Sequence, residues 1–294
     1  WLQTKFGNVL AQGFVQGQQL DQAGSRPAGS TDKEATNLVI ASVVARPFCS
    51  NNLYALGTSP VGQRQDCTSG GYSVNANISA VQGALTEAWQ QNGGGSNISC
   101  DPRFATKVLT TGAKVGANIS PGCNNGTIFK TAASKLSDVL SSTTITDGRA
   151  TIWAAPSGRV FTIDATLANG YGSYSDPKRI PNLAIFVDGD VEINSNVSQL
   201  DVSIISTGII KSCGTNYVSG APNCNNQLQV HGFWLANAFH FGRNYFNQAD
   251  PSNNPAELFV QTGQSIAFPP PGLDQTYGGD DSLIIRREDN PRLQ

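Results

Sequence analysis

The second half of the chain consists of short segments in which apolar and polar residues alternate. From about residue 150 onward, Gly, Asn, Ser or Pro residues separate six such segments. They cover residues 149–155, 159–167, 182–193, 201–212, 227–237 and 257–263. Alternation with period two is typical of β-strands, and short strands with turn residues between them indicate an all-β domain. The chain is therefore predicted to be mainly β.

Three of these segments share a glycine between apolar residues. The glycines are Gly189, Gly208 and Gly232, which lie 19 and 24 residues apart. A step of this length suits one turn of a parallel β-solenoid, where glycine fits positions at which turns crowd or the backbone bends. We expect a short right-handed parallel β-solenoid (β-helix-like) with a disulfide-containing, partly helical insertion. A β-sandwich is the alternative.

Composition divides the chain into four parts. Residues 1–45 are predicted to form N-terminal strands that join the β module, and residues 46–148 a disulfide-rich insertion of loops and helices. Residues 149–272 form the solenoid module, and residues 273–294 a C-terminal tail with a terminal strand.

Two helices are predicted within the insertion. Residues 78–91 carry apolar side chains at helical spacing, with Ser79 at the N-cap position. Residues 127–142 carry a second apolar stripe. Both stripes are interpreted as faces that pack on the core.

The cysteines indicate an oxidising compartment. There are six, Cys49, Cys67, Cys100, Cys123, Cys213 and Cys224, and no two form a C-x-x-C pair. Six cysteines allow 15 connectivities. Pairing of sequence neighbours (first with second, third with fourth, fifth with sixth) is favoured, because each bond would close a loop rich in Gly, Asn and Ser. Disulfides are typical of exported proteins, so an extracellular or cell-surface location is expected.

Acidic residues cluster on alternate positions of one predicted strand. Asp188, Asp190 and Glu192 share a face there, and Asp201 begins the next strand. A solvated outer face is the favoured interpretation. The rivals are a Ca²⁺ site, which would need oxygen ligands from a neighbouring strand, and a carboxylate pair of a glycoside hydrolase.

Several classes of function find no support in the sequence. The net charge of −2 gives no basic field for nucleic acid, and no apolar run approaches the roughly 20 residues of a membrane span. The G-x-S-x-G, P-loop and H-E-x-x-H motifs are absent, so no catalytic residue is assigned. No cofactor other than Ca²⁺ is considered. A glycan-binding module, presenting Trp153, Trp234, Tyr171 or Tyr245, is a further alternative.

The last part of the sequence holds one more apolar strand. A run of three prolines precedes a Gly-rich turn and the segment SLIIRRE, which contains Leu283, Ile284 and Ile285. This strand could fold back on its own domain, or it could add to a sheet edge of a neighbouring molecule as an assembly strand.

Several segments also resemble a group of known proteins. WLQTKFGNVLAQG, FVDGDVEINSNVSQLDVSIISTGII, LQVHGFWLANAFHFGRNY, NPAELFV and AFPPP occur in this order. The order resembles that of uncharacterised exported bacterial surface proteins of candidate-phyla (Patescibacteria-type) lineages, which carry a C-terminal solenoid-like β module. The array is also reminiscent of bactofilin-type polymerising β-helices. The resemblance implies a structural or adhesive role, such as a filament or appendage subunit that binds itself or other surface proteins. A carbohydrate-active β-helix enzyme is the main alternative.

Overall fold

The computed structural model describes the chain in several parts. Three strands are described by their backbone, β1 (Leu2–Lys5), β2 (Val9–Gly17) and β3 (Val39–Ala45). The remaining described residues are 78–95, 104–170, 172–214, 224, 226–243, 256–260 and 268–273.

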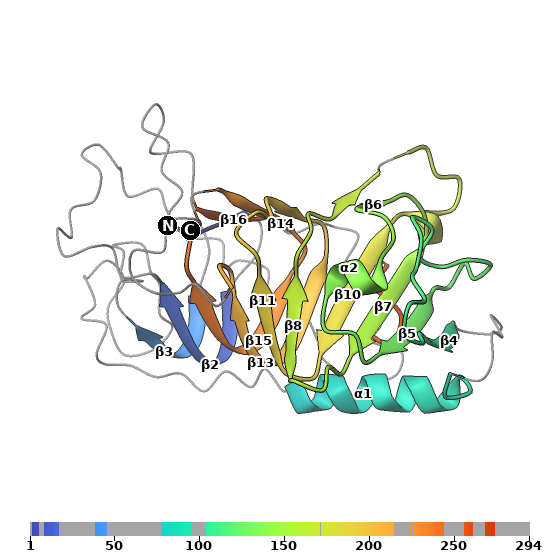
Figure 1. The fold of residues 1–294 in the computed structure, drawn as a ribbon, viewed down its shortest axis with the longest axis horizontal. Coiled ribbons are helices and arrows are strands. Elements are labelled where there is room, and N and C mark those ends of the chain that lie inside the picture. Colours follow the sequence, from blue (N-terminus) through green and yellow to red (C-terminus); the bar gives the residue numbers. More distant parts are fainter. Residues whose placement is uncertain are drawn as a thin grey trace, which may run out of the picture.

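Strands dominate the described residues (Figure 1). After β3 they are β4 (Ala105–Val108), β5 (Thr127–Thr131), β6 (Thr144–Ile145), β7 (Arg149–Ala154), β8 (Val160–Ile163), β9 (Ala168–Asn169), β10 (Asn182–Val187), β11 (Asp190–Ile193), β12 (Gln199–Leu200), β13 (Ser203–Lys211), β14 (Leu228–His231), β15 (Trp234–Phe241) and β16 (Glu257–Val260). The helical elements are α1 (Ile78–Gln91), α2 (Leu136–Val139) and the short 3₁₀ helix η1 (Pro177–Arg179). None of the described helices is long and apolar enough to cross a membrane.

All pairings between the described strands are parallel. The largest sheet runs in the order β3-β2-β15-β13-β10-β7-β5-β4, and β11 pairs with both β13 and β8. A second sheet has the order β1-β16-β14-β12, and β6 pairs with β9. The mainly-β prediction is confirmed, and the described strands do not form an antiparallel sandwich.

The step from one paired strand to the next varies in length. Residues paired in the centre of the large sheet lie 23, 33, 19 and 30 residues apart, through the pairs Phe129–Ile152, Ile152–Ile185, Ile185–Ile204 and Ile204–Trp234. Connections of unequal length between the strands produce this variation, which explains why a fixed repeat is weak in the sequence.

The three glycines of the sequence pattern lie at crowded positions, as expected. A Cβ atom at Gly189 would lie 2.1 Å from the Arg159 carbonyl oxygen, and one at Gly208 only 2.1 Å from Asp190 Oδ1. Gly208 donates its amide to the Gly189 carbonyl at 3.0 Å, so these two glycines stack at one corner. Gly232 lies at a different corner, between β14 and β15. The three glycines therefore do not mark a single repeated position.

Inward-facing apolar side chains form one large core inside the curved sheets. Its fully buried members include Phe161, Ile163, Leu183, Ile185, Val187, Val191, Ile193, Leu200 and Ile204. The alternation in the sequence predicts the inward positions of Ile185, Val187, Val191 and Ile193 correctly, because successive strand residues point to opposite faces.

The outer face of the large sheet is also buried where α1 covers it (Figure 1). Leu85 and Trp89 of this helix pack in one cluster with Trp153, Phe186 and Ile205 of β7, β10 and β13. Strand β10 is consequently buried on both faces. Helix α1 has the bounds predicted for the first helix, 78–91.

The insertion differs from its prediction. Residues 127–131 of the second expected helix form strand β5, and only Leu136–Val139 are helical. Since the core covers one face of β5 and α1 the other, its apolar residues run together and imitate a helical stripe. Strands β5 and β4 continue the large sheet beyond β7, so a boundary at residue 148 does not divide it.

Candidate functional site

The acidic stripe lies at a corner and not on one straight strand. Strand β10 ends at Val187 and β11 begins at Asp190, with Asp188 and Gly189 forming the corner between them. Gly189 has a φ of 145°, a conformation that side chains disfavour. The expectation of one continuous strand through all three acids is therefore wrong.

Each acid of the stripe has a partner on β13, nineteen residues further along the chain. Asp188 Oδ1 accepts from Thr207 Oγ1 at 3.2 Å, and Asp190 Oδ1 from the Ile209 amide at 2.9 Å. Glu192 Oε1 lies 2.9 Å from Lys211 Nζ, which is also 3.9 Å from Asp190 Oδ2. These bonds join two neighbouring strands.

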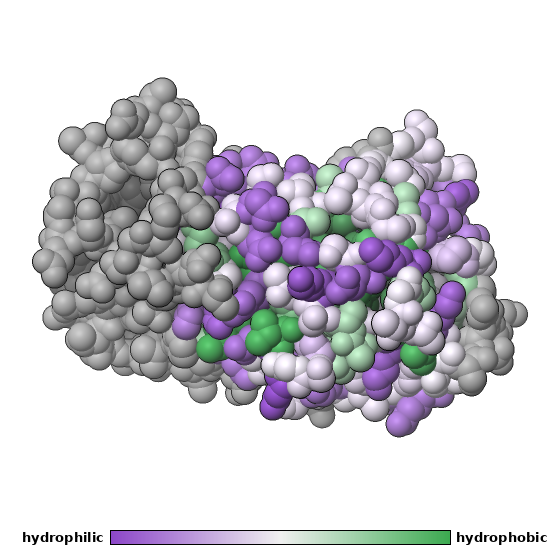
Figure 2. Space-filling view, viewed as in Figure 1, coloured by the Kyte–Doolittle hydropathy of each residue, from purple (hydrophilic) through white to green (hydrophobic). Residues whose placement is uncertain are grey.

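The stripe is only partly solvated. Asp188 and Asp190 are half-buried, while Glu192 is 8% exposed. Figure 2 shows hydrophilic residues spread over the face that contains β8 and β11. A lysine ammonium stands where a cation ligated by Asp190 and Glu192 would sit. Within the described ranges, no group of three or more His, Cys, Asp or Glu side chains gathers at metal-binding distance.

Asp201 lies apart from the stripe, in a buried pair with His231. Its carboxylate belongs to a residue that is 1% exposed, and Oδ1 lies 2.6 Å from His231 Nδ1. The Asn169 amide donates to Oδ2 at 2.7 Å, and Gln199 Nε2 to Oδ1 at 2.9 Å. The partners of Asp201 thus come from β9, β12 and β14, whereas those of the stripe come from β13.

The surroundings of Asp201 stabilise its charged form. Burial acts to raise the pKa of the carboxyl group, but hydrogen bonds from His231, Asn169 and Gln199 outweigh it, so the pKa is lowered from its usual value. An imidazole oriented by a carboxylate can serve as a general base. Among the described residues, however, no hydroxyl or thiol hydrogen-bonds to His231, and three donors enclose the Asp201 carboxylate.

A second buried polar cluster was not anticipated from the sequence. The guanidinium of Arg243 donates to three carbonyl oxygens, those of Ser212 at 2.8 Å, Asn194 at 2.9 Å and Asn226 at 3.2 Å. Glu257 Oε1 accepts from Ser212 Oγ at 2.6 Å and from the Arg243 amide at 3.2 Å. This cluster joins β11, β13, β14 and β16 at one corner of the fold.

Burial perturbs both charged groups of this cluster. It lowers the pKa of Arg243 to about 10, so the guanidinium remains charged at neutral pH. It raises the pKa of Glu257, against hydrogen bonds and charges that act in the opposite direction. The only sequence signal was a charged residue at the start of a strand, and alternation could not distinguish it from a solvated one.

A disulfide lies directly beside this cluster. Cys213 and Cys224 are bonded, with Cα atoms 6.0 Å apart, which confirms one of the three predicted pairs. Cys123 is disulfide-bonded as well. Three of the predicted cysteines lie outside the described residues, namely Cys49, Cys67 and Cys100.

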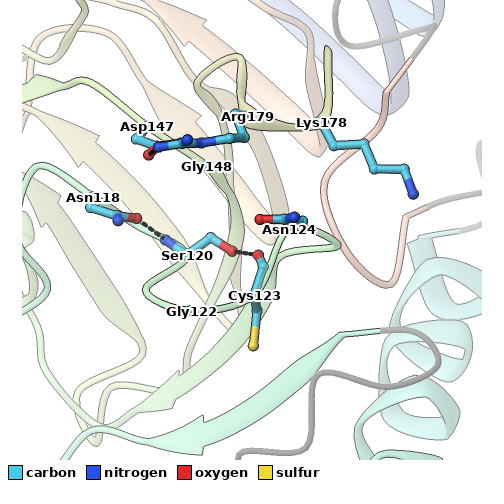
Figure 3. Close-up of a pocket in the computed structure, with 9 residues that line it drawn as sticks. All are labelled: Asn118, Ser120, Gly122, Cys123, Asn124, Asp147, Gly148, Lys178 and Arg179. Carbon is cyan, nitrogen blue, oxygen red and sulfur yellow. Dashed lines mark hydrogen bonds and ion pairs between the residues drawn. The ribbon is translucent and has the colours of Figure 1, made fainter. Parts of the chain in front are cut away.

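One small polar pocket opens beside the corner at Gly148 (Figure 3). It encloses about 80 Å³ and is lined by Asn118, Ser120, Gly122, Cys123, Asn124, Asp147, Gly148, Lys178 and Arg179. Arg179 is ion-paired with Asp147, and Lys178 Nζ donates to Asn125 Oδ1 at 3.0 Å. Ligand sites usually measure about 300–1,000 Å³, so this pocket is too small for a sugar chain.

The aromatic residues considered for glycan binding are largely internal. Trp153 packs edge-on against Trp89 at 6.3 Å and lies under the Lys130 ammonium at 4.2 Å. Trp234 packs edge-on against Phe259 at 4.7 Å. Both tryptophans are buried and present no open face. Tyr171 and Tyr245 lie outside the described residues.

Comparisons with known proteins add no identity. No family model matches the chain, and neither a curated protein nor a solved structure matches it. The segment considered as an assembly strand, Leu283 to Ile285, lies outside the described residues. The site assignments therefore rest on geometry alone.

Proposed function

We propose that this chain is an exported structural module of a cell surface, a short parallel β-solenoid that self-associates end to end. The observation that carries the proposal is the edge of the large sheet at β4. Among the described strands β4 pairs only with β5, and the sheet stops there. An unpaired edge is a template for another strand, and a head-to-tail contact between copies gives open filaments when the rotation does not close.

The use of the polar side chains supports a structural role. Asp188, Asp190 and Glu192 bond the next strand, Asp201 is enclosed by three donors, and Arg243 holds three carbonyls. A hydrolase that used these carboxylates would have to release them from such bonds. The Cys213–Cys224 disulfide supports an oxidising compartment, and hence export.

Self-association of the purified full chain tests the proposal. We expect the sedimentation coefficient to rise with protein concentration, and negative-stain microscopy to show linear polymers. Val108 of β4 is 49% exposed, the one large apolar side chain so exposed among the described residues. Val108→Lys places a charge on the edge and should weaken association about tenfold or more, since charged edge residues oppose strand pairing.

The matched control is Val108→Thr, which keeps the branched shape at the same site and should associate like the parent chain. Circular dichroism establishes that both variants are folded. A chain that stays monomeric at every concentration, both intact and without residues 274–294, would refute the proposal.

A further inference from the structure

The segment 268–273 crosses the outer face of the large sheet beside α1. Its backbone carbonyls accept hydrogen bonds from side chains of two strands. Asn182 Nδ2 donates to the Phe268 carbonyl at 2.8 Å, Arg149 Nη1 to Pro269 at 3.1 Å, and Thr151 Oγ1 to Pro271 at 2.6 Å. Residues 268–273 are called the strap below.

The strap runs across the strands in a definite direction. Phe268 bonds a residue of β10, whereas Pro269 and Pro271 bond residues of β7. Pro271 also lies against Gly126, and Gly272 lies against Ile128 of β5, where added Cβ atoms would contact their side chains. Each step brings the chain nearer to β4, which is the next strand after β5.

Strand β4 has one free side within the part of the chain that the structure describes. The amides of Ala105 and Leu109 donate to the Gly126 and Lys130 carbonyls. Because N–H groups alternate in direction along a parallel strand, the Val108 amide points away from β5. The side chain of Val108 is also half-exposed.

From this geometry we propose that residues 282–287 of the same chain add to the free edge of β4. The strap delivers the chain to β5, and β4 lies about 4.8 Å beyond it, the usual spacing of neighbouring strands. Residues 274–281 can span up to about 26 Å when extended, so they reach the edge easily. Leu283, Ile284 and Ile285 supply the apolar residues that suit a strand, and they would cover Val108.

This pairing regulates the edge on which self-association depends, and that consequence rests on the proposed function. A strand from the same chain occupies the hydrogen-bonding groups that a second copy would need. Self-association then requires release of residues 282–287. The module exports with its edge covered and polymerises when the segment is displaced.

Amide hydrogen exchange resolved by NMR tests the pairing directly. It is measured on the full chain at a dilution where sedimentation shows only monomers. Ile284→Pro removes an amide and disfavours a strand, and Ile284→Val is the matched control. We expect the Val108 amide to exchange about tenfold or more faster in Ile284→Pro, because it loses a partner. The amides of Lys107 and Leu109, which face β5, should stay unchanged.

The outcomes separate the pairing from the proposed function. Equal exchange of Val108 in the parent chain and in Ile284→Pro would overturn the pairing, whether or not the chain polymerises. Protection of Val108 that depends on protein concentration would also overturn it, since the strand would then come from a second copy. Faster exchange at Val108 without polymers in either chain would support the pairing and refute the self-association.

Discussion

Replacing Arg243 by methionine tests whether the buried polar cluster holds one corner of the fold together. The variant keeps an apolar stem of similar length but removes the guanidinium. Three carbonyl oxygens, of Asn194, Ser212 and Asn226, then lose their donor, and the Glu257 carboxylate loses a nearby positive charge. All three carbonyls lie in corners or connections between strands, where the ladder hydrogen bonds do not reach.

The size of the effect follows from burial. Arg243 is 4% exposed and Glu257 is 2% exposed. A buried acceptor left without a donor costs about 1–3 kcal/mol, and removal of one partner from a buried charged cluster costs about 3–5 kcal/mol in total. Because the energies of neighbouring groups are not additive, we expect the lower sum, about 3–5 kcal/mol of unfolding free energy.

Urea unfolding followed by tryptophan fluorescence, under non-reducing conditions, measures this loss. Arg159→Met is the matched control, because the Arg159 guanidinium is exposed and lies 3.8 Å from Asp188. An exposed ion pair contributes about 0–1 kcal/mol, so the control should unfold like the parent chain. A loss below about 1 kcal/mol in Arg243→Met would show that the cluster is not structural.

Two further predictions concern single residues. Asp201→Asn weakens the bond to His231 and should lower the unfolding free energy at pH 7 by about 2–3 kcal/mol. Because the pKa of Asp201 is lowered in the folded state, this contribution is present above the unfolded pKa of about 3.9 and is lost as pH falls through the folded pKa. The difference between variant and parent, measured by urea unfolding, should therefore shrink below about pH 4; a constant difference would contradict this. Gly189→Ala should cost about 3 kcal/mol or more, since its Cβ would lie 2.1 Å from the Arg159 carbonyl oxygen, while Gly158→Ala, with no atom within 4 Å, should leave the melting temperature unchanged; equal melting of both variants would contradict the crowding.

The local alternation of residues predicted most of the strands and one helix correctly. It succeeded where one face of a strand meets the core and the other meets polar surroundings, as in β11 and β14. It failed at β5, since α1 buries the second face and removes the alternation. It also placed Asp188 on a straight strand, because a corner occupies two residues and preserves the inward positions on either side.

The candidate site was harder to predict than the fold. The alternation indicated that Asp190 and Glu192 share a face, but it could not show that Lys211 lies between them. Asp201 was expected beside this stripe, whereas the structure pairs it with His231. Arg243 and Glu257 had no sequence signal, because a buried charged cluster and a solvated charge look alike along one strand.

By itself, the sequence determined which segments are strands and which side chains point inward. That information is local, since alternation depends on neighbouring residues and on the fixed two-residue period of a strand. The tertiary structure alone decided which strands meet. The steps between paired residues range from 19 to 33, and the N-terminal strand β2 pairs with β15, more than 200 residues away. Connections of different lengths set these contacts, so the pairs Asp201–His231 and Lys211–Glu192 and the direction of the strap toward β4 emerge only when the turns are stacked.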